Sequence, residues 1–215
     1  MKAAALLVPV LLLSTAQPVR AEAASGAAVK VTPGTVVVGE RGTGTWTTLS
    51  ATGIPAWVEL IDVDLYGPGG EHQPLDLSVR DLPGVWEGEV AFSRFDRAGK
   101  WRARLRFYGS GRRGEGPSVS FSVKRRTTLS TGGKSARGGA LKGVLRRIGS
   151  GAGYRPYAGQ KVRLYRWAGG TWKYVATDVT DAGGRYAFAK RPGRFQVRFA
   201  GTATNAPASR TAAVS

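Results

Sequence analysis

Apolar and polar residues alternate with a period of two along much of the chain. In the segment 101–107, one face of the expected strand carries Trp101, Ala103, Leu105 and Phe107, and the residues between them are arginines. An antiparallel sheet that buries one face and exposes the other to water has this pattern. Beyond the first 23 residues, no segment shows a convincing helical period of about 3.6 residues. The sequence therefore predicts an all-β protein.

Turn residues separate the predicted strands at intervals typical of β-sandwiches. In the first half the strands are expected over 28–32, 35–38, 45–51, 57–66, 75–79, 86–92, 100–108 and 118–123. In the second half they are expected over 140–148, 160–167, 171–177, 185–189, 194–200 and 210–214. Between two of these, Ala168, Gly169 and Gly170 form a connection short enough to predict a hairpin.

The two halves share features in the same order. The arginine-alternating run 99–109 has a counterpart at 193–201, and each is followed by a proline-containing loop and a final strand. The spacing Asp-x-x-Gly-x-aromatic precedes each run, as Asp81, Gly84 and Trp86 and as Asp181, Gly184 and Tyr186. We therefore expect two tandem Ig-like antiparallel β-sandwich domains, over 24–124 and 140–215, joined by a basic Gly/Ser-rich linker over 125–139.

The N-terminus has the organisation of a secretory signal peptide. Lys2 precedes an unbroken apolar run over 3–13, and Ala21 and Ala23 give a small-x-small cleavage pattern. The run is too short for a spanning helix, which needs about 20 apolar residues. We predict a signal peptide over 1–23, with Val19 to Ala21 as a second possible cleavage site, and no integral membrane segment after cleavage. The expected location is extracellular, free or associated with the cell envelope.

Cysteine is absent from the sequence. This excludes disulfides, zinc–thiolate sites, a thiol nucleophile and the lipidated cysteine of a bacterial lipoprotein. No phosphate-binding loop of Walker type occurs among the glycines, and no cofactor or metal is expected.

The net charge of +18 is concentrated in the second half. Residues 24–124 contain 12 Lys and Arg and 11 Asp and Glu, whereas residues 125–215 contain 18 basic residues and only Asp178 and Asp181 as acids. Such an asymmetry favours contact with a polyanion, bound largely through salt-sensitive electrostatics. Candidates are an anionic cell-envelope polymer, extracellular nucleic acid and an anionic membrane surface. The alternative is a basic surface that only keeps the protein soluble.

The second half also resembles the Ig-like repeats of secreted actinobacterial proteins. The resemblance is carried by Y-A-G-Q-K-V-R-L at 157–164, T-D-A-G-G-R-Y at 180–186 and G-R-F-Q-V-R-F-A-G-T at 193–202. Phe195 stands where the family pattern has a tyrosine. The transthyretin-like or carboxypeptidase-regulatory-like sandwich, which uses a similar T-D-x-x-G-x-Y run, is the near alternative. The resemblance implies a sandwich fold and a binding or envelope-associated role, with no catalytic residues.

Carboxylates and the single histidine of the first half are the candidates for catalysis. Asp62 and Asp64 lie two apart on one strand face, with Glu59 on the other, and paired carboxylates can hydrolyse glycosides. Solvent-facing charges that keep a strand soluble are the preferred interpretation. His72, the single histidine, lies in the polar segment 69–74 without a Gly-x-Ser-x-Gly motif, and we expect it to be an exposed loop residue.

Basic residues interleaved with aromatics form the predicted binding site. Such sets bind sugars, phosphates or single-stranded nucleic acid, although core aromatics backed by a solvated face give the same pattern. The candidate residues are Arg146, Arg147, Arg155, Lys161, Arg163, Tyr165, Trp167, Arg194 and Arg198. We therefore predict a non-catalytic binding protein whose basic C-terminal domain contacts an anionic extracellular polymer. The alternatives are a small carbohydrate-active enzyme using the N-terminal carboxylates and a purely structural spacer.

Overall fold

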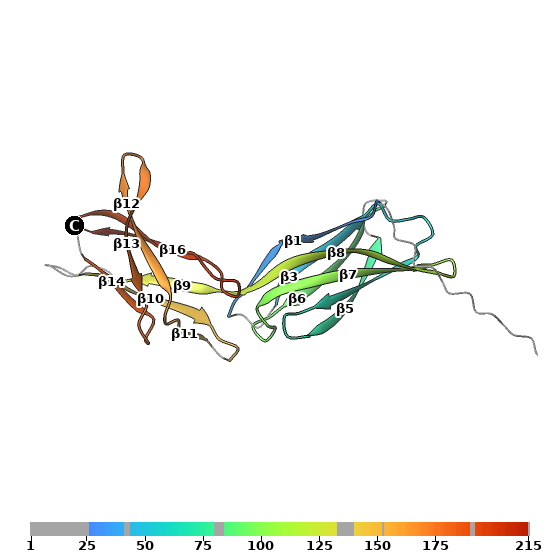
Figure 1. The fold of residues 1–215 in the computed structure, drawn as a ribbon, viewed down its shortest axis with the longest axis horizontal. Helices are drawn as coiled ribbons and strands as arrows, with labels where there is room; N and C mark the ends of the chain where they lie inside the picture. Colours follow the sequence, from blue (N-terminus) through green and yellow to red (C-terminus); the bar gives the residue numbers. More distant parts are fainter. Residues whose placement is uncertain are drawn as a thin grey trace, which may run out of the picture.

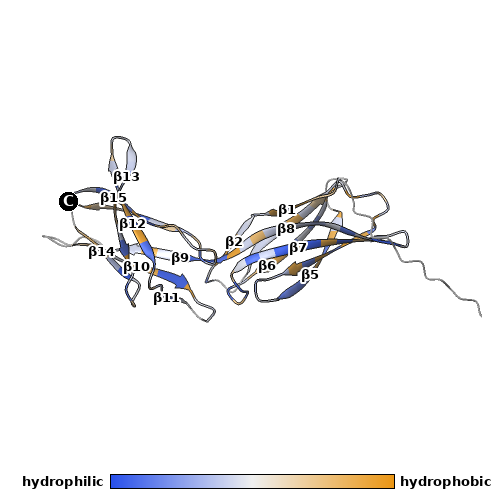
Figure 2. Cartoon of the chain, in the orientation of Figure 1, coloured by the Kyte–Doolittle hydropathy of each residue, from blue (hydrophilic) through white to orange (hydrophobic). Residues whose placement is uncertain are grey.

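A computed structural model describes residues 26–40, 44–79, 84–132, 140–151, 153–189 and 192–214. The predicted signal peptide lies outside these residues. The described part of the chain consists of strands, turns and loops without a helix, which confirms the all-β prediction. Two separate apolar cores define two β-sandwich domains, which lie end to end along the long axis of the molecule (Figure 1). Most strands combine hydrophobic and hydrophilic residues (Figure 2), as expected for sheets with one face in water.

The first domain packs two sheets against each other. One contains β1 (Ala28–Thr32), β3 (Thr45–Thr52) and β6 (Trp86–Phe92), and the other contains β5 (His72–Val79), β4 (Leu60–Tyr66), β7 (Gly99–Gly109), β8 (Arg112–Arg125) and β2 (Thr35–Val38). The end of β5 also pairs with β6, at Ser78 and Val79. The β2–β8 pair is parallel, which corrects the prediction of purely antiparallel sheets. After the Pro33–Gly34 turn the chain changes sheets without reversing, so β2 runs alongside β8 in the same direction.

An aromatic cluster fills the centre of the first core. The Trp101 ring lies 4.9 Å from that of Phe92 at a steep angle, and Phe92 lies 5.6 Å from Phe121. Edge-to-face contacts of this kind stabilise a core beyond the area that they bury. The indole nitrogen of Trp101 donates to the Arg97 carbonyl at 2.9 Å, so its one polar group is satisfied.

The second domain also has two sheets. One contains β9 (Thr127–Thr131), β10 (Leu141–Ile148), β11 (Tyr154–Pro156) and β14 (Arg185–Phe188). The other has the order β13 (Thr171–Val179), β12 (Lys161–Ala168), β15 (Gly193–Phe199) and β16 (Ala208–Val214). The core between them includes Leu145, Val162, Val197 and Phe199.

The linker predicted over 125–139 is wrong for its first part. Residues 127–131 form β9, which pairs antiparallel with β10, and only Arg126 separates β9 from β8. Thr127 and Leu129 are buried and alternate with exposed neighbours, a strand pattern that the Thr- and Ser-rich composition hides. Residues 133–139 of the predicted linker lie outside the described part of the chain.

Backbone hydrogen bonds fix the junction between the domains. The Arg125 amide donates to the Thr204 carbonyl at 2.9 Å, and the Ala206 amide donates to the Arg125 carbonyl at 2.9 Å. The Thr127 hydroxyl donates to the Ala206 carbonyl at 2.7 Å. The loop between β15 and β16 is therefore bonded to the end of β8, and the domains are joined by an ordered strand rather than by a flexible tether.

Other predicted strand limits also differ from the structure. The strand β4 begins at Leu60 rather than at residue 57, and β11 was not predicted. The strand β8 begins at Arg112, within a segment expected to be a break because of its glycines and proline. Gly116 is needed there because a Cβ atom at this position would lie 2.6 Å from the Phe107 ring. Glycine in this strand therefore marks close packing rather than a turn.

The T-D-x-x-G-x-Y segment of the second domain has a structural role. The Thr180 hydroxyl donates to the Tyr157 carbonyl at 2.7 Å, and Asp181 accepts 2.8 Å bonds from the amides of Gly183 and Arg185. Gly184 has a φ of 71°, and a Cβ atom there would lie 2.4 Å from the Leu145 carbonyl oxygen. These residues build the turn that directs Tyr186 into the core.

Tyr186 gives the second domain a predictable sensitivity to alkali. Burial raises the pKa of its hydroxyl above the ordinary value of about 10. Above that pH the hydroxyl ionises in the unfolded chain but stays protonated in the fold, so the free energy of unfolding should fall by up to about 1.4 kcal/mol per pH unit. Urea unfolding between pH 8 and 11 measures this. The Tyr186→Phe variant should lack this part of the slope, and an identical slope in the variant would contradict the prediction.

Candidate functional site

The outer surface of the β13–β12–β15–β16 sheet carries the candidate site. Val162 and Leu164 of β12 point into the core, as do Phe195 and Val197 of β15, so the residues between them point outward. We call this surface the cationic–aromatic face. It consists of Lys161, Arg163, Tyr165 and Trp167 of β12, Trp172 and Tyr174 of β13, and Arg194 and Arg198 of β15.

Cross-strand register places the aromatic residues of the face in pairs. Tyr165 lies opposite Tyr174 with ring centroids 6.0 Å apart, and Trp167 lies opposite Trp172 at 5.1 Å. The hairpin turn at Gly169 and Gly170 sets this register, and both glycines have positive φ values, of 59° and 76°. Tyr174 is 59% exposed and Trp167 is 41% exposed, so neither ring belongs to the core.

Arginines of β15 stack on these aromatic pairs. The Arg198 guanidinium carbon lies 4.3 Å from the Tyr165 ring centroid. That of Arg194 lies 5.9 Å from the Trp167 ring and 5.8 Å from the Trp172 ring. The Nε of Arg198 donates to the Gln196 side chain at 2.7 Å, which fixes the group further. Because guanidinium donors lie in the plane of the group, stacking on a ring leaves its edge available to an anion.

Both carboxylates of the second half accept hydrogen bonds from backbone amides away from the cationic–aromatic face. Asp178 accepts hydrogen bonds from the amides of Val179 and Ala187, and Asp181 holds the turn before β14. These bonds satisfy outward-facing amides of the edge strand β14, at Arg185 and Ala187. Within the described residues, all four ion pairs belong to the first domain. The cations of the cationic–aromatic face therefore have no carboxylate partner in the described part of the chain.

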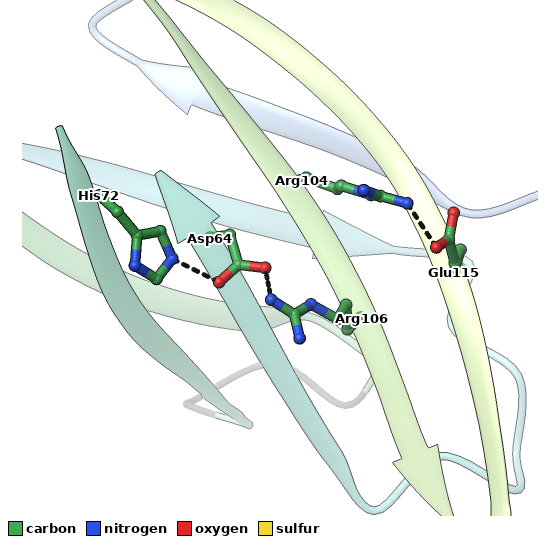
Figure 3. A network of polar contacts seen from close by, with 5 residues as sticks. All are labelled: Asp64, His72, Arg104, Arg106 and Glu115. Carbon is green, nitrogen blue, oxygen red and sulfur yellow. Dashed lines mark hydrogen bonds and ion pairs between the residues drawn. The ribbon is translucent and has the colours of Figure 1, made fainter. Parts of the chain in front are cut away.

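In the first domain, by contrast, Arg104 and Arg106 are paired with carboxylates (Figure 3). Asp64 is only 5% exposed and accepts from the Nε2 atom of His72 at 2.7 Å, while Arg106 bonds its other oxygen. Arg104 pairs with Glu115, and the hydrogen bond from Arg104 lowers the pKa of the Glu115 carboxyl. These two arginines of β7 thus meet carboxylates of neighbouring strands.

This network corrects two predictions. Asp64 is buried rather than solvent-facing. His72 is exposed as predicted, but it begins strand β5 rather than lying in a loop. The Tyr66 ring lies 5.2 Å from that of His72. Both differences arise because β4 pairs with β5, which places Tyr66 opposite His72. Such a pairing between strands could not be predicted from the pattern of one strand alone. Within the described residues, no hydroxyl is hydrogen-bonded to His72, and the contacts are those of charge neutralisation in a sheet.

The other predicted site residues lie on the opposite sheet. Arg146 and Arg147 belong to β10 and Arg155 to β11, where Arg147 lies directly opposite Arg155. Arg147 stacks on Tyr157, with its guanidinium carbon 4.6 Å from the ring. Burial and the nearby charge of Arg147 lower the pKa of Arg125 at the domain junction. Of the nine predicted residues, the structure thus groups six on the cationic–aromatic face and separates these three from it.

Sequence reasoning missed Trp172 and Tyr174. The signal was present, because a two-residue glycine turn places each residue of β12 opposite a defined residue of β13. Trp167 then faces Trp172, and Tyr165 faces Tyr174, before the register shifts at a bulge between Tyr165 and Leu164. The hairpin was predicted, but the residue pairs between its two strands were not worked out from the position of the turn.

A cavity of about 620 Å³ lies along β10 and β14 of the second domain. It is lined by both carboxylates, Asp178 and Asp181, together with Lys142 and Arg185. This mixed charge does not suit a polyanion. Among the described residues, no cluster of three or more His, Asp or Glu side chains could hold a metal ion. The same residues include no helix with the length and apolar character needed to cross a membrane.

Comparison with solved structures finds several β-rich proteins at low similarity. A DUF4785 family protein from Legionella pneumophila is 15% identical with a TM-score of 0.48, covering 84% of this chain and 55% of its own. A segment of two fibronectin type III domains from chicken tenascin is 13% identical with a TM-score of 0.46, covering 87% of this chain and 98% of its own. This chain therefore spans about half the length of the Legionella protein. Scores this low carry no information about function.

No protein-family model matches the chain, and no curated protein matches it either. The resemblance of the second half to secreted actinobacterial repeats therefore stays a prediction. The sandwich architecture rests on the sheets and cores of the structure itself.

Proposed function

We propose that this chain is an exported, non-catalytic binding protein whose second domain contacts an anionic polymer of the cell envelope. One observation carries the proposal. The cationic–aromatic face gathers four cations and four aromatic rings, while both carboxylates of the second half are bonded to backbone amides elsewhere. A folded surface with this composition attracts polyanions at long range and releases their counterions on contact.

The face is suited to a linear ligand rather than to a single small anion. Arg194 and Arg198 lie four residues apart on one strand, about 13 Å at the usual rise per residue. Lys161 and Arg163 add charges on the neighbouring strand, and Arg163 lies directly opposite Arg198. A chain of phosphates or carboxylates can therefore contact several cations in succession.

The arginine stacking favours recognition of charge over recognition of bases. The guanidinium group of Arg198 lies over the Tyr165 ring, and that of Arg194 lies over the Trp167 and Trp172 rings. Non-specific binding of single-stranded nucleic acid uses ring faces on which successive bases stack. Here those rings orient guanidinium groups instead, which supports an envelope polymer over extracellular nucleic acid as the ligand.

Location outside the cell is part of the proposal. It rests on the N-terminal sequence, with its basic start, apolar run and small-x-small pattern. An exported basic domain meets anionic polymers of the envelope first, and non-covalent binding would retain it there.

Retention of the processed full chain on immobilised polymers tests the proposal. We expect binding to poly(glycerol phosphate) and to purified wall polymer, with none to neutral dextran. The logarithm of the binding constant should fall linearly with the logarithm of salt concentration, by about 0.7 per phosphate contacted. Stronger binding to oligo(dT) than to poly(glycerol phosphate) would favour nucleic acid. Salt-independent binding, or no binding to any polymer, would support the spacer alternative.

A further inference from the structure

A small basic pocket lies where the second domain meets the first. Its volume is about 330 Å³, and its polar lining consists of Lys100 of β7 with Ser120, Ser122 and Lys124 of β8. Ala203, from the loop between β15 and β16, contributes the wall from the second domain. The predicted binding residues include none of these side chains.

Strand alternation brings the polar groups together on one face. Phe121 and Val123 point into the first core, so Ser120, Ser122 and Lys124 project from the opposite side of β8. Lys100 is paired directly with Ser122 across the β7–β8 ladder. Two lysines and two serines of the first domain therefore line one space.

Carboxylates of the same sheet do not reach this pocket. Asp64 is occupied by His72 and Arg106, and Glu115 by Arg104, all farther along the sheet. No ion pair in the described part of the chain involves Lys100 or Lys124. Two lysines line the same pocket, and an anion bound between them would relieve their mutual repulsion.

The pocket is preformed because its second-domain wall is fixed. The backbone of Thr204 and Ala206 is hydrogen-bonded to Arg125. Asn205, which is 1% exposed, donates to the Tyr157 hydroxyl at 3.1 Å and to two threonine hydroxyls of the same loop. The loop next to Ala203 is therefore held in place from both domains, and little ordering is needed on binding.

We propose that this junction pocket binds a phosphate group. Lysines act as point-charge donors to phosphate, whereas a carboxylate is better matched by the planar fork of arginine. The serine hydroxyls can donate to further phosphate oxygens. The site is separate from the cationic–aromatic face and does not depend on the function proposed for it. The group could come from free phosphate or from a phosphodiester of a polymer.

Isothermal titration calorimetry of the processed full chain tests the site. The probes are inorganic phosphate and glycerophosphoglycerol, which is a phosphodiester, and the tighter ligand identifies the source. The double variant Lys100→Gln with Lys124→Gln should weaken binding of that probe at least about tenfold, the loss expected for charge-assisted hydrogen bonds. The pair Lys30→Gln with Lys173→Gln removes the same charge from exposed strand positions and should leave binding within about twofold.

A substitution that leaves the charge unchanged distinguishes binding in the pocket from a general effect of positive charge. Ala203 is exposed, so Ala203→Leu is compatible with the fold, yet its larger side chain would fill the pocket without changing any charge. We expect this variant to weaken phosphate binding at least about fivefold by excluding the ligand. Equal losses in the two double-lysine variants, or unchanged binding by Ala203→Leu, would overturn the proposal. Neither result would bear on the proposal that the cationic–aromatic face binds a polymer, which is tested separately.

Discussion

Replacing Arg194 and Arg198 with glutamine is expected to weaken polymer binding by about 10- to 100-fold at low salt. Each guanidinium lies over an aromatic ring, so each substitution removes a pre-oriented contact that is worth about 1 kcal/mol. The slope of the logarithm of the binding constant against the logarithm of salt should fall by about 1.4, because two phosphate contacts are removed. Retention of the processed chain on poly(glycerol phosphate) at several salt concentrations measures both quantities.

A matched pair in the first domain controls for net charge. Arg112 and Arg113 are exposed at the start of β8, and Arg113 also stacks on a ring, that of Tyr108, at 5.7 Å. The Arg112→Gln, Arg113→Gln variant therefore removes the same charge and one similar stacking contact. It should change the affinity less than about threefold. If both double variants weakened binding equally, the basic surface would act through bulk charge, and the cationic–aromatic face would have no special role.

The second large effect is expected from Gly143→Ala. Gly143 lies in β10 between β9 and β14, and a Cβ atom there would lie 2.0 Å from the Ser130 carbonyl oxygen and 2.2 Å from the Tyr186 hydroxyl. These two atoms are hydrogen-bonded to each other at 2.6 Å directly across the glycine. The methyl group would separate them and force the strands apart, so we expect the second domain to lose about 3 kcal/mol or more of stability.

Chemical unfolding measures this loss, and Gly132→Ala provides the comparison. At Gly132, which lies next to β9, the nearest atom to an added Cβ is the Lys142 carbonyl oxygen at 3.2 Å. A shift of a few tenths of an ångström accommodates that contact, so the cost should stay below about 1 kcal/mol. Similar losses at both positions would show that the crossing of Tyr186 over Gly143 is not what makes the site intolerant.

Strand positions could be predicted wherever apolar residues marked the buried face. This was so for β7, where Trp101 to Phe107 alternate with arginines, and for β15, where Phe195, Val197 and Phe199 do so. It was not so for β9, whose inward positions are Thr127 and Leu129. Nor was it so for the start of β8, where Gly116 packs closely on β7. In these strands tertiary packing decides the conformation, and single-residue preferences suggest a linker or a turn.

The candidate site could be predicted strand by strand but not as a surface. Alternation along β12 and β15 placed Lys161, Arg163, Arg194 and Arg198 outward. Proximity in sequence gave no guide to Arg146, Arg147 and Arg155, which lie on the other sheet because β10 and β11 belong to it. Assigning a residue to a sheet requires strand order, which depends on contacts between distant segments.

The short connection between β8 and β9 has a consequence for avidity. Because only Arg126 separates these strands, the junction pocket and the cationic–aromatic face keep a constant separation and orientation. For a polymer that is long enough to reach both, the second contact forms at a high effective concentration, with no tether entropy lost on the protein side. Polymer length should therefore act as a threshold: fragments too short to reach both places would bind weakly, and those long enough would bind as bivalent ligands.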